Sequence, residues 1–382
     1  MPELRPIPLF PVSVVGSWPR PRPLLEATRR KSADLERLRD DACNEAIDAM
    51  VAAGVDVLTD GEQRRDNFYS FLAEKLDGVE LMTMADLLDY VEDKAAFEAL
   101  LQTLDVPAFA IKNPTIRGRL ARRTPLAAGE LEFLRARTDR ACKVTLPGPY
   151  LLSRSMWVKQ LSADAYPTRE ELCADIVRIL REELLELVQQ GVEVVQFDEP
   201  VLTEIVFAGK AATRTFMCAA LAAAADPAAE LELAVDLINR VVDGIDGTMT
   251  AIHVCRGNWS RQEDVLLSGD YAPLLPTLAK MKVGQFVLEY ATPRAGSETL
   301  LAQLPANCSI GFGAVNPRTD PDEEPAAVAE RVARLADLLG ADRIWLNPDC
   351  GFGTFADRPV ATTEVAIAKV RILAEAARIL RG

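Results

Sequence analysis

The sequence predicts an α/β protein with the fold of a (β/α)8 (TIM) barrel, and three observations lead to this prediction. Eight short apolar runs of strand length recur along the 382 residues, centred near positions 14, 57, 145, 195, 251, 286, 310 and 345. Segments with a helical spacing of apolar residues separate most of them. The turn after the first run lacks the glycine-rich pattern of a nucleotide-binding open sheet. Eight strands that alternate with helices make a parallel barrel.

The first two expected strands both end in polar side chains. Residues 13–17 form an apolar run that stops at a Gly-Ser-Trp-Pro turn, so Ser17 should lie on a loop at the end of this strand. Residues 34–54 have the spacing of an amphipathic helix. Residues 55–62 then predict a second strand with Glu62 at its end, which gives the β-α-β order of a parallel sheet.

Residues 63–140 interrupt this order. They contain mixed segments, including a basic stretch at 117–123 that we expect to be helical. No serine- and glycine-rich linker and no block of charge marks them as an independent domain. We therefore expect a single barrel domain over residues 1–382, in which residues 63–140 form an insertion after the second strand, near the mouth of the barrel.

The alternation resumes beyond this insertion. The remaining strands are expected at 143–147, 192–198, 248–255, 283–289, 308–316 and 343–347. The remaining helices are expected at 168–191, 231–242, 271–281, 325–340 and 363–380. Thr168 is the expected N-cap of the longest helix, and Gly191 is its expected stop.

The most informative motif is His253-Val-Cys255, which contains the only histidine of the sequence. Residues i and i+2 of a β-strand point to the same face, so the imidazole and the thiol would be directed at one point. Imidazole and thiolate are ligands that Zn2+ prefers. Two ligands do not make a site, however. His-X-Cys pairs also arise by chance, and a buried cysteine commonly packs as a small apolar residue.

Two later segments supply further zinc ligands, because Glu289 ends one apolar run and Cys350 follows another. With His253 and Cys255 they could fill a tetrahedral site, or three could bind the metal while the fourth position exchanges for substrate. Active sites of such barrels lie at the C-terminal ends of the strands. Seven polar residues fall at these ends: Ser17, Glu62, Asp198, His253, Cys255, Glu289 and Cys350.

Taken together, these segments resemble the catalytic domain of cobalamin-independent methionine synthase and the shorter single-barrel proteins related to it. The resemblance covers nearly the whole chain. The motifs that carry it, in matching order and spacing, are Val15-Gly-Ser17, Asp60-Gly-Glu62, Pro147-Gly-Pro149, Phe197-Asp-Glu-Pro200, His253-Val-Cys255, Glu289 and Asn347-Pro-Asp-Cys-Gly351.

The resemblance implies a set of functional residues. The implied zinc ligands are His253, Cys255, Glu289 and Cys350. The residues implied to bind the amino acid part of homocysteine are Gly16, Ser17, Glu62 and Asp198, with Glu62 and Asp198 as the catalytic carboxylates. A thiol is mostly protonated at neutral pH, whereas the thiolate is the nucleophile, and Zn2+ removes that proton. The zinc thiolate would then attack an electrophilic methyl carbon.

The sequence departs from the family where the methyl donor is bound. We expect no second, N-terminal barrel, with which the large synthases bind polyglutamyl folate, because 382 residues are too few. Ser155 stands where those proteins have an indole that stacks on the pterin, and Trp157 is two residues away. The family's later histidine, regarded as a proton donor, has no counterpart. Arg318, near that position, could contact an anionic substrate group but is a poor acid.

Three functions follow from these motifs. The first, which we expect, is zinc-dependent methyl transfer to homocysteine from a donor such as a methyl-corrinoid carrier protein or a folate without polyglutamate. The second resembles the epoxyalkane:coenzyme M transferases, in which a zinc thiolate opens an epoxide. Coenzyme M carries a sulfonate and no amine, so the carboxylates Glu62 and Asp198 disfavour it. The third is a zinc-binding accessory protein without turnover.

The composition restricts the partners and the compartment. A net charge of −14 argues against nucleic acid or an anionic membrane surface as a partner. No apolar stretch reaches the 18 residues of a membrane span. The first residues lack a secretory pattern, and seven scattered cysteines indicate reduced thiols, so we expect a cytoplasmic protein. Self-association into a homo-oligomer is left open.

Overall fold

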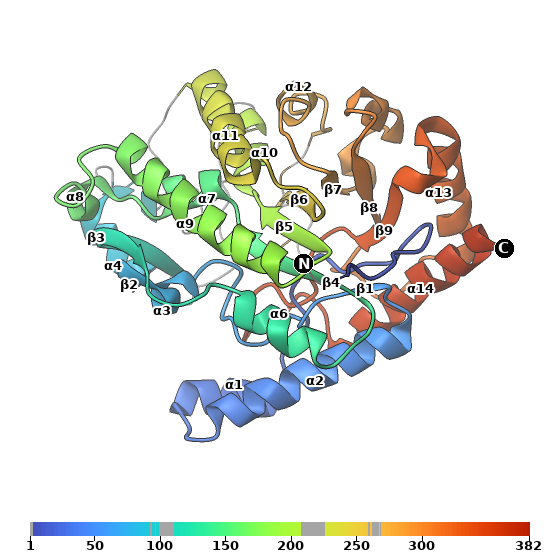
Figure 1. Cartoon of the computed structure of the whole chain (residues 1–382), viewed down its shortest axis with the longest axis horizontal. Helices are drawn as coiled ribbons and strands as arrows, with labels where there is room; N and C mark the ends of the chain where they lie inside the picture. The colour runs from blue at the N-terminus through green and yellow to red at the C-terminus, as the bar shows by residue number, and fades with distance from the viewer. Residues whose placement is uncertain are drawn as a thin grey trace.

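A curled parallel sheet of seven strands forms the centre of the protein (Figure 1). The computed structural model describes residues 3–91, 94–95, 97–98, 111–207, 226–258, 260–261, 267 and 269–382. In spatial order the strands are β1 (Val57–Leu58), β4 (Ala141–Pro147), β5 (Val194–Asp198), β6 (Met249–Val254), β7 (Gln285–Glu289), β8 (Ser309–Val315) and β9 (Ile344–Pro348). Each neighbouring pair is parallel, and spatial order follows sequence order. Successive crossovers of one hand produce such an order.

The segment around Val12 touches both edges of this sheet. Val12 forms a parallel bridge with Leu346 of β9, and Ser13 forms one with Val57 of β1. The backbone N–H of Ser13 donates to the carbonyl of Leu346 at 3.0 Å, and the N–H of Val57 donates to the carbonyl of Val12 at 3.2 Å.

A regular first strand over residues 13–17 was expected, and this expectation was wrong. Beyond Ser13 the backbone carbonyl groups accept hydrogen bonds from side chains instead of from a neighbouring strand. The carbonyl of Val14 accepts from the ammonium group of Lys143, and that of Val15 accepts from the amide of Gln196 at 3.0 Å. The backbone at Val14 and Val15 is therefore bound by side chains inside the curled sheet and not by the backbone hydrogen bonds of a neighbouring strand.

The expected helices are present with shifted bounds and surround the strands in Figure 1. They are α2 (Leu35–Ala53), α9 (Arg169–Gln189), α11 (Pro227–Val242), α12 (Leu275–Leu278), α13 (Pro325–Leu339) and α14 (Thr363–Arg381). Thr168 caps α9 as expected, because its side chain accepts from the backbone N–H of Glu171. The shorter helices are α1 (Arg22–Arg30), α7 (Pro149–Ser155), α8 (Lys159–Ser162), α10 (Val201–Phe207), η5 (Pro293–Ala295), η6 (Glu298–Gln303) and η7 (Ala341–Arg343).

Residues 63–140 contain a separate antiparallel sheet, in which β2 (Leu76–Thr83) pairs with β3 (Lys112–Arg122). The helices here are α3 (Leu72–Lys75), α4 (Met84–Leu87), η1 (Leu88–Tyr90) and α6 (Ala128–Arg135). The basic stretch at 117–123 lies largely in β3, so the expectation of a helix there was wrong. In this stretch the buried Leu120 lies between exposed neighbours, which is the period of a strand. Residues 99–110 of the expected insertion lie outside the described residues.

The interior of the curled sheet is built in layers of period two. An apolar layer contains Val15, Val57, Ala141, Val194, Ala251, Val287 and Trp345. Two residues further along five of these strands the inner side chains are polar: Lys143, Gln196, His253, Glu289 and Asn347. The apolar layer thus forms a floor, above which the functional groups gather. No helix among the described residues is long and apolar enough to cross a membrane.

Candidate metal and substrate site

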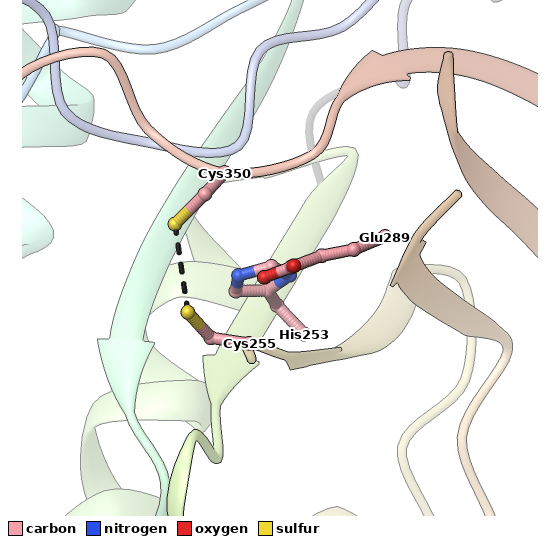
Figure 2. Close-up of side chains that lie close together, drawn as sticks. All are labelled: His253, Cys255, Glu289 and Cys350. Carbon is pink, nitrogen blue, oxygen red and sulfur yellow. Dashed lines mark hydrogen bonds between the residues drawn. The ribbon is translucent and has the colours of Figure 1, made fainter. Parts of the chain in front are cut away.

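The four side chains predicted to bind zinc lie together at the C-terminal ends of β6, β7 and β9. One ligand atom from each of His253, Cys255, Glu289 and Cys350 lies within 4.8 Å of the others. Figure 2 shows the two thiols facing each other, with the imidazole and the carboxylate beside them. Three of these residues are buried, and Cys350 is half-buried.

His253 is oriented as a ligand. Its Nδ1 lies 3.2 Å from the backbone carbonyl of Val287, an acceptor that fixes the proton on this nitrogen. Nε2 is buried and has no hydrogen-bond partner in the described part of the chain. A hydrogen bond from one ring nitrogen to a carbonyl is the usual support of a metal-bound histidine, whose other nitrogen presents its lone pair to the ion.

Glu289 is held by two donors. The backbone N–H of Arg256 donates to Oε1 at 2.7 Å, and the guanidinium group of Arg294 donates to Oε2 at 3.0 Å. Each carboxylate oxygen offers more than one lone-pair site, so both oxygens keep the capacity to bind an ion. Burial, and then the neighbouring Cys255, raise the pKa of Glu289 to about 8. A cation in the cluster would relieve both effects.

The spacing of the thiols also fits zinc. The Sγ atoms of Cys255 and Cys350 are 3.7 Å apart. Two Zn–S bonds of ~2.3 Å at a tetrahedral angle put the sulfurs about 3.8 Å apart. The hydrogen bond from Cys350, and next His253, lower the pKa of Cys255 well below that of an ordinary thiol. The donor set, the free Nε2 and this spacing all suit a tetrahedral cation site.

A cavity opens beside the cluster and encloses about 610 Å³ including its mouth. Its lining brings together the following predicted site residues: Gly16, Ser17, Glu62, Asp198, His253, Cys255 and Cys350. Glu289 lies beside these last three residues but does not line the cavity. The loops after β1, β5, β6 and β9 and the segment after Ser13 therefore meet at one site.

Glu62 reaches the cavity from a strained loop. Its backbone φ is +54°, in the left-handed region that non-glycine residues rarely adopt. Its Oε1 accepts from the hydroxyl of Thr145 at 2.8 Å and lies 3.9 Å from the guanidinium group of Arg65. A Cβ on Gly16 would lie 2.3 Å from this same oxygen, so only glycine leaves room for the carboxylate.

Asp198 enters the cavity from the end of β5. Its Oδ1 accepts from the amide of Gln196 at 2.8 Å, and the oxygen of that amide accepts from Lys143 at 3.2 Å. Burial, together with the nearby Glu62, raises the pKa of Asp198 to about 7. Burial lowers the pKa of Lys143 to about 7 as well. Bound cationic substrate would stabilise the charged form of Asp198.

Ser17 joins the first segment to the loop after β9. Its Oγ accepts from the backbone N–H of Thr354 at 3.1 Å, and its carbonyl accepts from the N–H groups of Phe352 and Gly353. A Cβ on Gly351 would lie 2.4 Å from the Oγ, so this loop can approach Ser17 only through a glycine.

Arg318 is not part of the cavity lining, although it was predicted to bind substrate. It is buried, and its Nε donates to the side chain of Asn258 at 2.7 Å. Arg64 and Arg65, which follow Glu62 in the sequence, are also outside the lining. Arg64 pairs with Asp40, and Arg65 pairs with Glu130.

The position at which the family has a pterin-stacking indole, Ser155, is also outside the cavity, as is Trp157. Ser155 is fully buried and its hydroxyl donates to the carbonyl of Leu151, while the indole N–H of Trp157 donates to the carbonyl of Tyr166. Several residues of the lining were not predicted from the sequence: Asn67, Phe68, Asn258, Thr354 and Phe355. They lie on loops, which carry no periodic signal. Their place directly after the strand-end motifs was the one available clue.

The fold and the site define a class of protein, namely an α/β enzyme with a curled parallel sheet and a buried thiol, imidazole and carboxylate cluster at its C-terminal edge. A family model described as "Cobalamin-independent synthase, Catalytic domain" matches residues 10–378. The chain belongs to this family.

Individual relatives agree with this membership. The methionine synthase of Sulfolobus acidocaldarius is 27% identical over 353 residues, which cover 90% of this chain and 86% of that protein. The methionine synthase of Thermococcus kodakarensis is 28% identical over 364 residues, covering 93% and 90%. A solved structure of a B12-independent methionine synthase from Shewanella sp. W3-18-1 matches with a TM-score of 0.72 at 23% identity and covers 98% of each chain, which shows the shared fold.

Proposed function

We propose that the protein is a zinc-dependent methyltransferase that converts homocysteine to methionine. The observation that carries this proposal is the juxtaposition of the cluster of His253, Cys255, Glu289 and Cys350 with a cavity lined by Glu62 and Asp198. Family membership and the names of the curated relatives support methyl transfer to homocysteine. Before zinc binds, the two thiols, 3.7 Å apart, are close enough to form a disulfide in an oxidising compartment, which supports action in the reducing cytoplasm.

Each group of residues has a distinct part in this proposal. Zinc held by the cluster would supply the Lewis acidity that lowers the pKa of the substrate thiol. Glu62 and Asp198 hold the ammonium group of homocysteine and so orient the sulfur toward the cluster. Gly16 and Thr145 keep the carboxylate of Glu62 in place, and Gln196 does the same for Asp198. The apolar floor below them excludes water from this end of the cavity.

The same cavity supports a proposal about the methyl donor. None of the described residues that line it is a lysine or an arginine, and neither Ser155 nor Trp157 offers a stacking surface there. A polyanionic polyglutamyl folate lacks a cationic partner in such a cavity. We therefore propose that the donor is a methyl-corrinoid carrier or a folate without the polyglutamate tail. The carboxylates likewise disfavour coenzyme M, which is anionic and has no amine.

The complete architecture is also a proposal. We propose that the segment at Val12 and Ser13 takes the place of the first strand and completes an eight-stranded barrel, since it bridges both edges of the sheet. Residues 1–382 would then form one domain. The pair of strands β2 and β3 would be the insertion after the second barrel strand, within residues 63–140.

The test is product identification with the zinc-loaded protein. Homocysteine and coenzyme M are each offered with methylcobalamin, methyltetrahydrofolate and its triglutamate, and the products are identified by mass. We expect methionine, with the triglutamate a poor donor. Alkylation of coenzyme M alone would refute the proposed function. Turnover of the triglutamate near the enzyme median of about ten per second would refute the donor proposal only.

A further inference from the structure

Asn258 is a buried polar residue of the cavity to which the sequence assigns no role. It follows the motif of His253 and Cys255 on the loop after β6, lines the cavity and is only 1% exposed. The preceding residue contacts the metal cluster, because the backbone N–H of Gly257 donates to the Sγ of Cys255 at 3.2 Å. Asn258 therefore lies beside the place where the substrate sulfur would react.

Two arginines fix the orientation of the Asn258 carboxamide. Its Oδ1 accepts from the Nε of Arg318 at 2.7 Å and from the Nη2 of Arg294 at 3.3 Å. A guanidinium group only donates, so the amide oxygen must face the arginines and the NH2 group must point away from them. The Nδ2 atom is buried and has no hydrogen-bond partner among the residues that the structure describes. A buried donor without a partner is costly, and such a donor in a cavity indicates an acceptor on the ligand.

Asn258 is also linked to Ser17 through two hydrogen bonds of Thr354. The hydroxyl of Thr354 donates to the carbonyl of Asn258 at 3.5 Å, and the N–H of Thr354 donates to the Oγ of Ser17 at 3.1 Å. On this side of the cavity the Nδ2 of Asn258 is a neutral donor, and the guanidinium groups of Arg294 and Arg318 lie against the oxygen of the same carboxamide. The carboxylates Glu62 and Asp198 also line the cavity and supply its negative charge. This distribution suits a ligand with a positive and a negative end.

We propose that Asn258 donates a hydrogen bond to the carboxylate of the amino acid thiol and so makes the site specific for an α-amino acid. The inference rests on the proposed function and deepens it. In this arrangement the ammonium group of the substrate meets Glu62 and Asp198, and the carboxylate meets the NH2 group of Asn258. Arg294 and Arg318 act as positioning residues, because they hold the amide oxygen and leave only the donor for the substrate.

Replacing Asn258 by aspartate gives a sharp test. Asn258→Asp keeps the shape and the contacts with both arginines, but it replaces the NH2 donor by an oxygen that repels a carboxylate. Binding is measured by calorimetry on the zinc-containing protein without any methyl donor. The two ligands are homocysteine and 3-aminopropane-1-thiol, which has the same thiol and amine but no carboxylate. Asn258→Ala, which removes the donor without adding charge, is measured in parallel.

We expect Asn258→Asp to weaken homocysteine binding roughly 10- to 100-fold, as the loss of a hydrogen bond to a charged group does. Binding of 3-aminopropane-1-thiol should change by less than about threefold, because that ligand makes no such bond. Asn258→Ala should weaken homocysteine less than the aspartate does. Equal losses for the two ligands, or no loss for either, would overturn the inference.

A matched control is Asn316→Asp. The side-chain oxygen of Asn316 accepts a hydrogen bond from the backbone N–H of Arg318, but Asn316 does not line the cavity. This variant should leave both affinities within about twofold. The wild-type protein separates the two proposals. If it binds coenzyme M and not homocysteine, the proposed function fails. If the wild type and the Asn258→Asp variant bind homocysteine with the same affinity, only the proposed role of Asn258 is refuted.

Discussion

The two cysteines of the cluster give the first prediction at the scale of single residues. Serine at position 255 or 350 cannot supply a thiolate, so Cys255→Ser and Cys350→Ser should each lower the zinc content from about one ion per chain to well below one. Elemental analysis of the purified proteins measures it. Cys308→Ser is the matched control, because Cys308 is buried but donates to the carbonyl of Val283, away from the cluster. Full zinc content in both test variants would contradict the assignment.

Asp198 gives the second prediction. Asp198→Asn keeps the hydrogen bond from Gln196 but removes the charge that faces the ammonium group of the substrate. Homocysteine should bind roughly 10- to 100-fold more weakly, while the zinc content stays at the wild-type level. Calorimetry and metal analysis on the same sample give the two values. Unchanged affinity for homocysteine would show that the ammonium group lies elsewhere.

Some residues of the site could be predicted from the sequence and others could not, and the difference has a physical reason. His253 and Cys255 could be found because the period of a strand sends both to one face, and the structure brings Glu289 and Cys350 to them. The role that we propose for Asn258 could not be found. It depends on Arg294 and Arg318, whose distance from Asn258 follows only from tertiary packing.

The same contrast appears at the scale of elements. The strands that end in the site are buried on both faces, so they appear in the sequence as mainly apolar runs with few polar residues, such as Lys143 and Gln196. The stretch at 117–123 was misinterpreted because arginine and leucine favour helices on their own. Its pairing with β2, which lies about 40 residues earlier, overrides this local preference. Strand propensity depends on such partners, and a single segment does not reveal them.

Glu183 of α9 gives a prediction about the packing of elements. Its buried carboxylate accepts from the backbone N–H groups of Leu126, Ala127 and Ala128 at the start of α6 and pairs with Arg122. Glu183→Ala would leave these donors buried without an acceptor. We expect the free energy of unfolding to fall by about 3 kcal/mol, measured by denaturant titration.

Glu182 of the same helix supplies the control for this prediction. It forms an ion pair with Arg178 at 3.0 Å, but both side chains are exposed. Glu182→Ala should change the free energy of unfolding by less than about 1 kcal/mol. Equal losses in the two variants would show that the cap on α6 contributes nothing beyond an ordinary surface charge.

Lys143 gives a prediction for the whole molecule, because it lies in the interior and joins the segment at Val14 to Gln196 of β5. Burial lowers its pKa from 10.5 to about 7 in the folded state. Between these two values the unfolded chain binds the proton and the folded protein does not, so stability rises with pH in this range. Lys143→Met removes the titrating group. Relative to this variant, the wild type should gain up to about 1.4 kcal/mol per pH unit between pH 7 and 9.

Denaturant unfolding of both proteins at several pH values measures this difference. The subtraction cancels the groups that titrate alike in the two proteins. Parallel stability curves would mean that Lys143 keeps its proton in the folded state. In that case the electrostatic attraction of Asp198 and Glu62 would outweigh the cost of burial.

The bridges made by Val12 and Ser13 have a consequence for the order in which the protein is assembled during translation. The partner of Ser13 in β1 is synthesised soon afterwards, but the partner of Val12 is Leu346. The ribosome must therefore add most of the polypeptide before this early segment can acquire both neighbours. Until then the segment at Val12 and Ser13 has one unpaired side, and nascent chains halted before residue 344 should be cut readily by protease near residues 9–20.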